Sequence, residues 1–350
     1  MTQSNRNFTA AQAAARLGVS IKALRLYERH GLIAPGRTPA GWRAYGPAEM
    51  ARAREIVSLR LLGLSLAQVA CLLDGDSGGL DAALAAHEER LKGQSRHIAA
   101  NLIEVRRLRS VVARGETPTL GEVSGLIDAD PRPGVGFGLP WPWGGEWFEL
   151  GAIGPLTYIT GPLGSGKTRL AMRVAEALPD ARFVGLERLA DDGEAALSQL
   201  AEKTDLQLRV QRSLDWLVGD GATRCRPLIA LLVVLEAEGS TNLVVDMVEQ
   251  GLDQATQEAL IAYLRLRSKG ERRLILLTRS SSILDLDAVG PDEVIIYCPA
   301  NHSPPLRVAP HPASPGYEAV ETCLASPEVR ARTAGIIAMR PSEASVRPVA

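Results

Sequence analysis

The spacing of apolar and polar residues divides the chain into segments with different periodicities. Residues 8–73 form short amphipathic segments separated by turns, and Ser20 follows a Gly-Val turn at a position where it can cap a second helix. Residues 35–41 contain two prolines and two glycines, so we expect an irregular loop there, followed by helices near 47–62 and 65–73. This order of elements predicts a helix-turn-helix unit.

Residues 78–113 predict a single long helix. The segment contains no proline, and apolar residues recur at a seven-residue step at Leu84, Leu91, Ile98, Val105 and Val112. A helix of this length spans about 50 Å and presents a coiled-coil seam. The alternative, an amphipathic helix that lies on the second domain of the same chain, remains open at this point.

The second half of the chain predicts an α/β domain. Residues 115–145 hold five prolines among many glycines and are expected to be a linker without regular structure. From 146 to 300, strands alternate with helices, as in a mostly parallel sheet covered on both faces. We expect strands at 155–160, 181–186, 241–245, 273–278 and 293–298. We expect helices at 167–178, 193–202, 226–238 and 254–268, and two more in the proline-rich tail at 316–325 and 327–338, before a loose end.

Composition changes this picture mainly through charge. Apolar residues make up 46% and aromatic residues 4% of the chain, so the cores must be mostly aliphatic. The net charge of −1 conceals an asymmetry, because residues 1–115 carry 17 Lys and Arg against 9 Asp and Glu, whereas the rest of the chain is acidic. A basic block of this kind favours contact with the phosphates of nucleic acid.

The four cysteines are far apart and show neither metal-ligand nor disulfide spacing. This usage is typical of a reducing compartment, and we expect a cytoplasmic protein. The start of the chain lacks the apolar run of a secretory signal. No apolar stretch approaches the roughly 20 residues that cross a bilayer, so no membrane partner is expected.

A glycine-rich loop lies between the first predicted strand and helix of the α/β domain. It satisfies the pattern G-x-x-x-x-G-K-[ST] with Gly161, Gly164, Ser165, Gly166, Lys167 and Thr168. In such a loop, backbone N–H groups and the lysine bind phosphates, and the threonine hydroxyl binds Mg²⁺. Asp246 ends another predicted strand and is the candidate second Mg²⁺ ligand. We therefore expect ATP, or another nucleoside triphosphate, together with Mg²⁺.

The helix-turn-helix unit provides the candidate DNA-binding residues. The second helix of such a unit enters the major groove, where its early residues meet bases and phosphates. Lysine and arginine neutralise phosphates, and arginine can also bind guanine with two hydrogen bonds. The expected partner is double-stranded DNA. The candidates are Ser20, Lys22, Arg25 and Tyr27 in the helix, and Arg37, Arg43 and Tyr45 in and beside the loop.

These residues belong to a longer pattern. It consists of Leu24-Arg25-Leu26-Tyr27-Glu28-Arg29, Gly31-Leu32, Pro35, Arg37, Gly41, Arg43 and Tyr45. It resembles the head of MerR-type transcriptional regulators over about residues 8–113, with departures at Leu26 and Trp42. The resemblance implies a winged helix-turn-helix, an antiparallel homodimer through the long helix, a promoter element as target and RNA polymerase as a further partner. Metal-sensing members carry cysteines near the end of that helix, which this chain lacks, so a metal sensor is disfavoured.

Residues 146–300 resemble the ABC-type ATPases in a degenerate form. Gly251-Leu252-Asp253 stands in register with that family's pattern after Asp246, but Met247 replaces its catalytic glutamate and Arg279 its histidine. The tripeptide 219–221 could correspond to the family's Ser-x-Gly signature, without the serine. An intact phosphate loop beside missing hydrolytic groups predicts nucleotide binding with little or no hydrolysis.

Two questions stay open within this domain. Glu249 is the candidate catalytic base in place of the missing glutamate, and a solvated loop carboxylate is the alternative interpretation. One of Trp141, Trp143 and Trp147 either stacks on adenine or pins the linker to the domain surface.

Together these patterns predict an N-terminal all-α winged helix-turn-helix with a long dimerisation helix, then an α/β P-loop NTPase domain with a mostly parallel sheet. The expected segments are a DNA-binding domain at 1–76, an antiparallel coiled coil at 77–114, a linker at 115–145, a nucleotide-binding domain at 146–300 and a partly helical extension at 301–350. The predicted function is a dimeric transcriptional regulator of MerR type that ATP modulates. The alternative is an active ATPase that the head targets to DNA, where it remodels DNA or a bound partner. A small-molecule kinase, or a sensor of a different nucleotide, is a third possibility.

Overall fold

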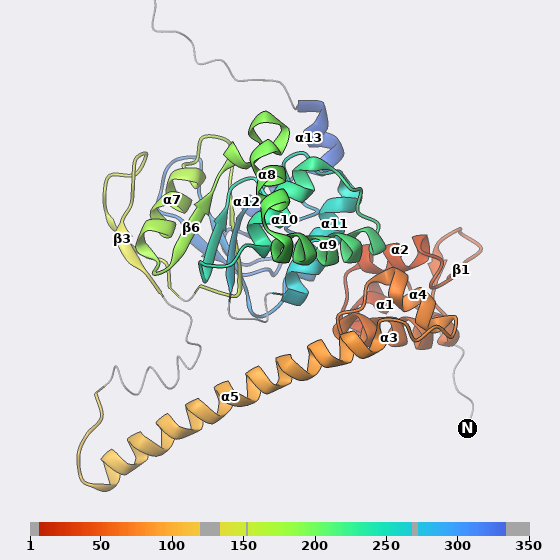
Figure 1. The fold of residues 1–350 in the computed structure, drawn as a ribbon, viewed down its shortest axis with the longest axis horizontal. Helices are drawn as coiled ribbons and strands as arrows, with labels where there is room; N and C mark the ends of the chain where they lie inside the picture. The colour runs from red at the N-terminus through yellow and green to blue at the C-terminus, as the bar shows by residue number, and fades with distance from the viewer. Residues whose placement is uncertain (1–6, 120–133, 152, 268–271, 334–350) are drawn as a thin grey trace, which may run out of the picture.

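The computed structural model describes residues 7–119, 134–151, 153–267 and 272–333. A small helical head, one long helix and an α/β unit follow one another along the chain. The head lies against the α/β unit, and the long helix extends from the head past that unit (Figure 1). Parts of the expected linker and tail helix, and the loose end, lie outside the described residues.

The head consists of four helices, as the sequence predicts, and a short hairpin where an irregular loop was expected. Its elements are α1 (Ala10–Leu17), α2 (Ile21–Arg29), β1 (Gly36–Arg37), β2 (Arg43–Ala44), α3 (Pro47–Leu61) and α4 (Leu66–Leu73). Ser20 caps α2, because its Oγ accepts a hydrogen bond from the N–H of Ala23 at 3.1 Å. Leu24 and Ile56 are fully buried in the core that holds these helices together. The antiparallel hairpin of β1 and β2 occupies the position expected for a wing.

The long helix α5 (Leu80–Ala113) has 34 residues. The five residues of the expected seam are between 37% and 66% exposed, so they do not pack on the α/β unit of the same chain. Their role in a dimer stays a prediction. Among the described helices, none combines the length and the apolar character that a membrane crossing requires.

The α/β unit is built on a six-stranded sheet with the order β10-β9-β5-β8-β7-β6. Its strands are β5 (Leu156–Thr160), β6 (Ala181–Val184), β7 (Asn242–Val245), β8 (Arg273–Leu277), β9 (Glu293–Tyr297) and β10 (Leu306–Val308). The first five are parallel and confirm the predicted strands, whereas β10 pairs antiparallel with β9. β10 was not predicted, and the tail therefore contributes to the sheet. β5 lies between β8 and β9, so the glycine loop that follows it starts near the middle of the sheet's carboxyl edge.

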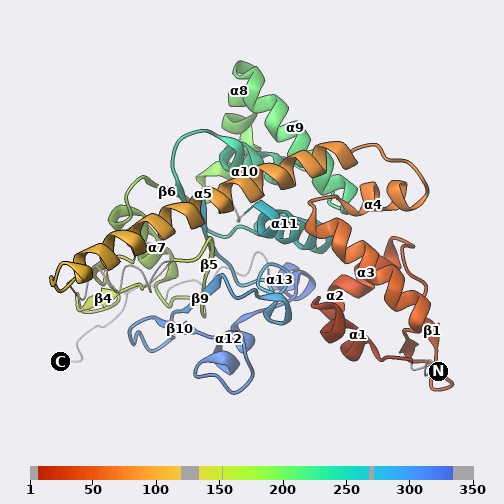
Figure 2. The same cartoon turned by 90° about the horizontal axis from the view of Figure 1, so that it is seen from below.

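Helices cover both faces of the sheet (Figure 1 and Figure 2). They are α7 (Lys167–Ala177), α8 (Glu194–Glu202), α9 (Thr204–Gly219), α10 (Arg226–Glu236), α11 (Gln254–Arg267), α12 (Tyr317–Cys323) and α13 (Pro327–Thr333), with short 3₁₀ segments η1 (Leu186–Gly193) and η2 (Leu286–Ala288). Successive strand residues face opposite cores: Tyr158 packs with α9, α10 and α11, and Ile159 packs with α7. α9 was not predicted.

The expected linker at 115–145 is wrong in its second part. Gly136–Gly138 forms β3, which pairs antiparallel with β4 (Trp147–Glu149). Phe137 and Trp143 are buried in the same core as Ile159 of the sheet, because this hairpin covers one sheet face beside α7. At the other end, Val320 of α12 belongs to the opposite core. The α/β unit is therefore larger than the predicted range of 146–300.

Candidate nucleotide and DNA sites

The glycine loop connects the carboxyl end of β5 to the first turn of α7. A Cβ on Gly161 would lie 2.3 Å from the carbonyl oxygen of Cys298, and one on Gly166 would lie 2.7 Å from the ring of Trp143. Both glycines also have positive φ values, so side chains there would be strained as well as crowded. Among the described residues no side chain caps the start of α7, whose N–H groups therefore suit an anion.

Lys167 directs its ammonium group back into this loop. Its Nζ donates to the carbonyl oxygens of Gly161 at 2.9 Å and Pro162 at 2.6 Å, and it lies 3.4 Å from the hydroxyl of Ser165. Burial lowers the pKa of Lys167 from its usual value. A phosphate in the loop would give this partly desolvated cation a charged acceptor in place of neutral ones, which strengthens its hydrogen bonds.

Thr168, in the first turn of α7, meets Asp246, which directly follows β7. The Thr168 hydroxyl donates to Oδ2 of Asp246 at 2.9 Å. Burial raises the pKa of Asp246, and the hydrogen bond from Thr168 opposes that shift. A hydroxyl and a carboxylate oxygen side by side are the hard ligands that Mg²⁺ prefers. The residues present thus fit a nucleotide with its metal ion.

Arg188 is a half-buried cation beside Asp246 that the sequence did not single out. It lies in η1 and donates to the carbonyl oxygens of Gly185, Asp246 and Met247 at 2.7, 2.8 and 2.7 Å. Met247 has a φ of +48°, a left-handed conformation that is uncommon for a residue with a side chain. Arg188 therefore holds the turn that places Asp246 at the end of β7.

Glu249 is buried, with 3% of its surface exposed, so its interpretation as a solvated loop carboxylate is wrong. Its Oε1 accepts hydrogen bonds from the backbone N–H of Arg279 at 3.1 Å and from the guanidinium of Arg330 in α13. Its Oε2 has no partner among the described residues. Arg330 comes from the tail, 81 residues further along the chain, and no sequence pattern pointed to it.

The tripeptide 219–221 ends α9 and contacts the head. The Asp220 carboxylate accepts two hydrogen bonds from Arg60 of α3, at 2.7 and 2.6 Å, and one from the N–H of Leu66 at 2.7 Å. Its side chain is fully buried. These contacts give the tripeptide a structural role in joining the head to the α/β unit, in place of the nucleotide-binding role expected from its correspondence to the Ser-x-Gly signature.

The three tryptophans have different environments. Trp143 is buried and donates from Nε1 to the carbonyl oxygen of Ser303 at 3.0 Å, so it pins the hairpin to the α/β unit. Trp141 is 65% exposed, and its ring centroid lies 5.1 Å from the guanidinium carbon of Arg169, the residue that directly follows Thr168 of the glycine loop. Trp147 is exposed on β4. Trp143 thus pins the hairpin, whereas stacking on adenine stays a prediction for the exposed Trp141 and Trp147.

The candidate DNA-binding residues separate into a structural and an exposed group. Tyr27 and Tyr45 are buried in the head's core, where their rings hold α2 and the hairpin in place. Ser20 acts as the helix cap. The side chains that remain accessible are those of Lys22, Arg25, Arg37 and, partly, Arg43. Arg37 and Arg43 both pair with Glu28, which orients the hairpin cations relative to α2.

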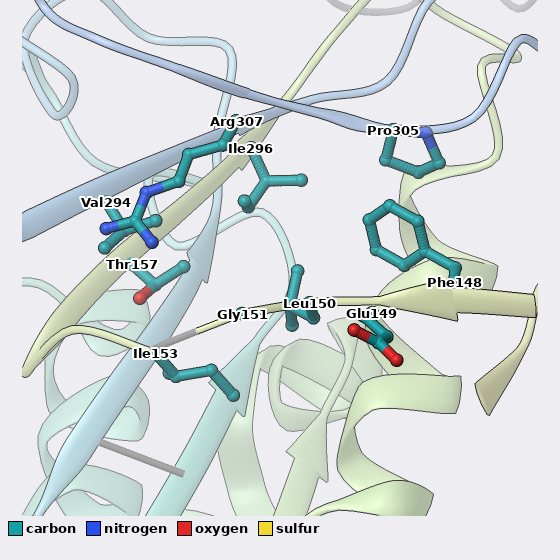
Figure 3. Close-up of a pocket in the computed structure, with 10 residues that line it drawn as sticks. All are labelled: Phe148, Glu149, Leu150, Gly151, Ile153, Thr157, Val294, Ile296, Pro305 and Arg307. Carbon is teal, nitrogen blue, oxygen red and sulfur yellow. The ribbon is translucent and has the colours of Figure 1, made fainter. Parts of the chain in front are cut away.

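A separate cavity lies between the β3–β4 hairpin and the sheet. It measures about 280 Å³ and is lined mainly by apolar side chains, including Phe148, Leu150 and Ile296. Figure 3 shows the Arg307 side chain near Thr157 and Val294 at one side of this cavity, with Phe148 and Glu149 at the other. It contains none of the predicted site residues.

Comparison with known proteins assigns the head. The model of the MerR helix-turn-helix family of regulatory proteins matches residues 8–76. The mercuric resistance operon regulatory protein of Serratia marcescens is 33% identical over 118 residues, which cover 33% of this chain and 75% of that protein. The transcriptional activator TipA of Streptomyces coelicolor is 31% identical over 128 residues. The match covers 35% of this chain and 51% of TipA, so the chain spans about half the length of that relative.

Solved structures resemble separate parts of the chain. One is HiNmlR, a MerR family regulator lacking the sensor domain and bound to promoter DNA, with a TM-score of 0.24 at 24% identity. The match covers 31% of this chain and 92% of the HiNmlR chain. Another is MJ1267, an ATP-binding cassette of an ABC transporter, with a TM-score of 0.34 at 15% identity. The match covers 58% of this chain and 98% of the MJ1267 chain. The family match and the identity over three quarters of the mercuric regulator are decisive, and the chain belongs to the MerR family of helix-turn-helix regulatory proteins.

Proposed function

We propose that this chain is a transcriptional regulator whose binding to double-stranded promoter DNA is modulated by ATP, or another nucleoside triphosphate, held with Mg²⁺ at the α/β unit. The observation that carries the proposal is the hydrogen bond between Thr168 and Asp246 beside the glycine loop, in a chain that also has a MerR-type head. The domains we propose are those expected from the sequence, with one change. The nucleotide-binding unit also includes the β3–β4 hairpin, and β10 and α12 after residue 300.

Each part of the nucleotide has candidate partners. The N–H groups of the loop and Lys167 would bind the phosphates, and Thr168 and Asp246 would hold Mg²⁺, which neutralises phosphate charge when bound. The exposed ring of Trp141 is placed for stacking on the base. The ribose and base edges have no assigned partner, so the proposal extends to nucleoside triphosphates as a class.

Slow hydrolysis is expected because this chain has no carboxylate at the position where the ABC-type ATPases carry their catalytic glutamate. Met247 follows Asp246 directly, and the nearby Glu249 accepts hydrogen bonds from Arg279 and Arg330 through one of its oxygens. A carboxylate paired with a guanidinium is a weaker base towards water than a free one. Such a site suits a sensor that responds to occupancy.

The DNA-binding surface of the proposal consists of Lys22 and Arg25 on α2 and Arg37 and Arg43 on the hairpin. Their positive charge matches the basic block at the start of the chain. The exposed apolar row of α5 would pair with the same row of a second copy, antiparallel as in the family, and so set the spacing of two heads on DNA. RNA polymerase is proposed as a further partner on the same grounds of family membership.

The test compares DNA binding with and without nucleotide in matched variants. ATP with Mg²⁺ should change the DNA affinity of the wild type, and Lys167→Ala should abolish that response while DNA binding itself persists. Lys203→Ala is the control, since it removes an exposed lysine of the same unit outside the loop. A DNA affinity that ATP leaves unchanged in all three proteins would overturn the proposal.

A second candidate function, an active DNA-targeted ATPase, is favoured by one observation. Glu249 is buried near Asp246 and its Oε2 has no partner among the described residues, so that oxygen is available to orient a water molecule. Repeated turnover of ATP that Glu249→Gln abolishes, without loss of nucleotide binding, would establish this alternative. Absence of repeated turnover in the wild type would exclude it, and turnover that Glu249→Gln leaves unchanged would exclude Glu249 as its base.

A further inference from the structure

The contact between the head and the α/β unit is made of opposite charges. The ion pairs are Lys22–Asp285, Arg29–Glu258 and Arg60–Asp220, with N···O distances of 3.1, 2.8 and 2.6 Å. All three cations belong to the head and all three carboxylates to the α/β unit. The carboxylates are well covered, with side-chain exposures of 11%, 14% and 0%, so this is a formed interface and not a chance approach of two surfaces.

Other contacts fix the register of this interface. The indole N–H of Trp216 donates to the carbonyl oxygen of Gly63 at 2.8 Å, and its ring lies 4.8 Å from the guanidinium carbon of Arg60. A Cβ on Gly219 would lie 2.8 Å from the hydroxyl oxygen of Ser65, so the end of α9 approaches α4 more closely than another residue would permit. Helices α9 and α11 border the head in both overall views (Figure 1 and Figure 2).

The helix face used in this contact is the face proposed to read DNA. Residues 22, 25 and 29 are spaced i, i+3 and i+7 and therefore lie on one side of α2. Lys22 donates to the carbonyl oxygen of Ser281 at 3.0 Å in addition to its pair with Asp285. Two of the three N–H donors of its ammonium group are thus directed at the α/β unit, and Asp285 neutralises its charge, so a DNA phosphate competes with these partners for Lys22.

We infer that Glu258 and Asp285 form a docking face that imitates DNA phosphates and competes with DNA for the chain's own head, while Asp220 anchors the contact through Arg60. The docked arrangement is a form with weakened DNA affinity. Binding of DNA requires the head to leave this face, at least around Lys22. The acidic balance of the chain after residue 115 favours such competition with the basic head.

The docking face is joined directly to the proposed nucleotide site. The backbone N–H of Arg279 binds Glu249, and two residues later the carbonyl of Ser281 binds Lys22. The tail is hydrogen-bonded to the same segment, because Ala325 accepts from the N–H of Ser281 and donates to the carbonyl of Arg279. A shift of this buried segment at its nucleotide side would therefore move an acceptor of Lys22. Regulation of docking by nucleotide rests on the proposed function; the competition with DNA does not.

The first test measures docking in solution by zero-length cross-linking with a carbodiimide, which joins a lysine amine to an adjacent carboxylate. Mass spectrometry should find a cross-link between Lys22 and Asp285, and a random-sequence DNA duplex at low salt should suppress it in proportion to binding. Lys22→Arg removes the amine and is the negative control. A cross-link whose yield is the same in DNA-saturated protein would overturn the inference. A yield that DNA suppresses and that ATP with Mg²⁺ leaves unchanged would support the competition and count against the proposed function alone.

The second test changes only the docking face and leaves the head intact. The double variant Asp285→Asn, Glu258→Gln should bind the same duplex about three- to tenfold more tightly than wild type, because two partly exposed ion pairs of the docked form are lost. The matched control is Asp287→Asn, Glu318→Gln, which removes the same charge from exposed positions of the same unit. Equal DNA affinities of these two double variants would overturn the inference, since charge alone would then explain any gain.

Discussion

The pair of Arg60 and Asp220 is the most deeply buried of the three ion pairs between the head and the α/β unit. Replacing Asp220 with leucine leaves the Arg60 guanidinium, which is 13% exposed, without its charged partner and the Leu66 N–H without its acceptor. Such a loss costs about 3–5 kcal/mol where the surroundings stay closed. Because the two units can separate and let water reach Arg60, we expect an observed loss in the free energy of unfolding of about 2 kcal/mol.

A double-mutant cycle isolates this interaction. Asp220→Leu, Arg60→Met and the combined variant are unfolded in guanidinium chloride and followed by tryptophan fluorescence, to which Trp216 at the interface contributes. We expect each single variant to be destabilised and the combined variant to recover about 1–3 kcal/mol relative to the sum. Single effects that add to within about 0.5 kcal/mol would refute the reasoning, because the two side chains would then not interact in solution.

Four further outcomes are expected. Chelation of Mg²⁺ should weaken ATP binding to the wild type but not to Thr168→Ala, because that variant already lacks a metal ligand. Calorimetry measures both affinities, and an equal effect of chelation on the two proteins would count against Thr168 as a ligand. Trp141→Ala should weaken ATP binding by about 1–3 kcal/mol, because its ring stacks on the base, whereas Trp147→Ala should leave ATP binding unchanged. Equal ATP affinities of these two variants would contradict the stacking role of Trp141. Ile98→Glu should convert a dimer to a monomer in analytical ultracentrifugation, because a charge enters the apolar row of α5. Burial raises the pKa of Cys298 to about 12, so the thiol should resist alkylation in the folded protein up to pH 9. Since the pKa of this thiol is lower in the unfolded chain, stability should fall as pH rises from about 9 towards 12, and it should fall less steeply in Cys298→Ala; equal slopes in the two proteins would refute this contribution.

The strongly periodic parts of the fold could be predicted from the sequence. The five parallel strands and most helices of the α/β unit were found because their apolar runs are long or regularly spaced. β3 and β10 were missed because each has three residues, too few for a period to emerge. α9 was missed although Leu206, Val210, Leu214 and Leu217 recur at helical spacing with polar residues between them, which is the pattern of an amphipathic helix.

The candidate site was predictable where it is contiguous in the chain. The glycine loop and its threonine are local, and Asp246 follows from its place at the end of a strand. The pairing of Arg330 with Glu249 crosses 81 residues, and that of Arg60 with Asp220 crosses 160, so neither leaves a periodic or local trace. Tyr27 and Tyr45 show a different limit: a family pattern marks residues that matter but does not separate those that touch DNA from those that support the fold.

The central claim is that nucleotide occupancy and DNA binding are coupled in one chain. Its most direct measurement is the dissociation constant for a DNA duplex with and without a saturating, non-hydrolysable ATP analogue and Mg²⁺, together with the dissociation constant for the analogue with and without DNA. The account predicts that both change by the same factor, about fivefold or more, because coupling between two sites is reciprocal. Two dissociation constants that do not respond to the other ligand would contradict it.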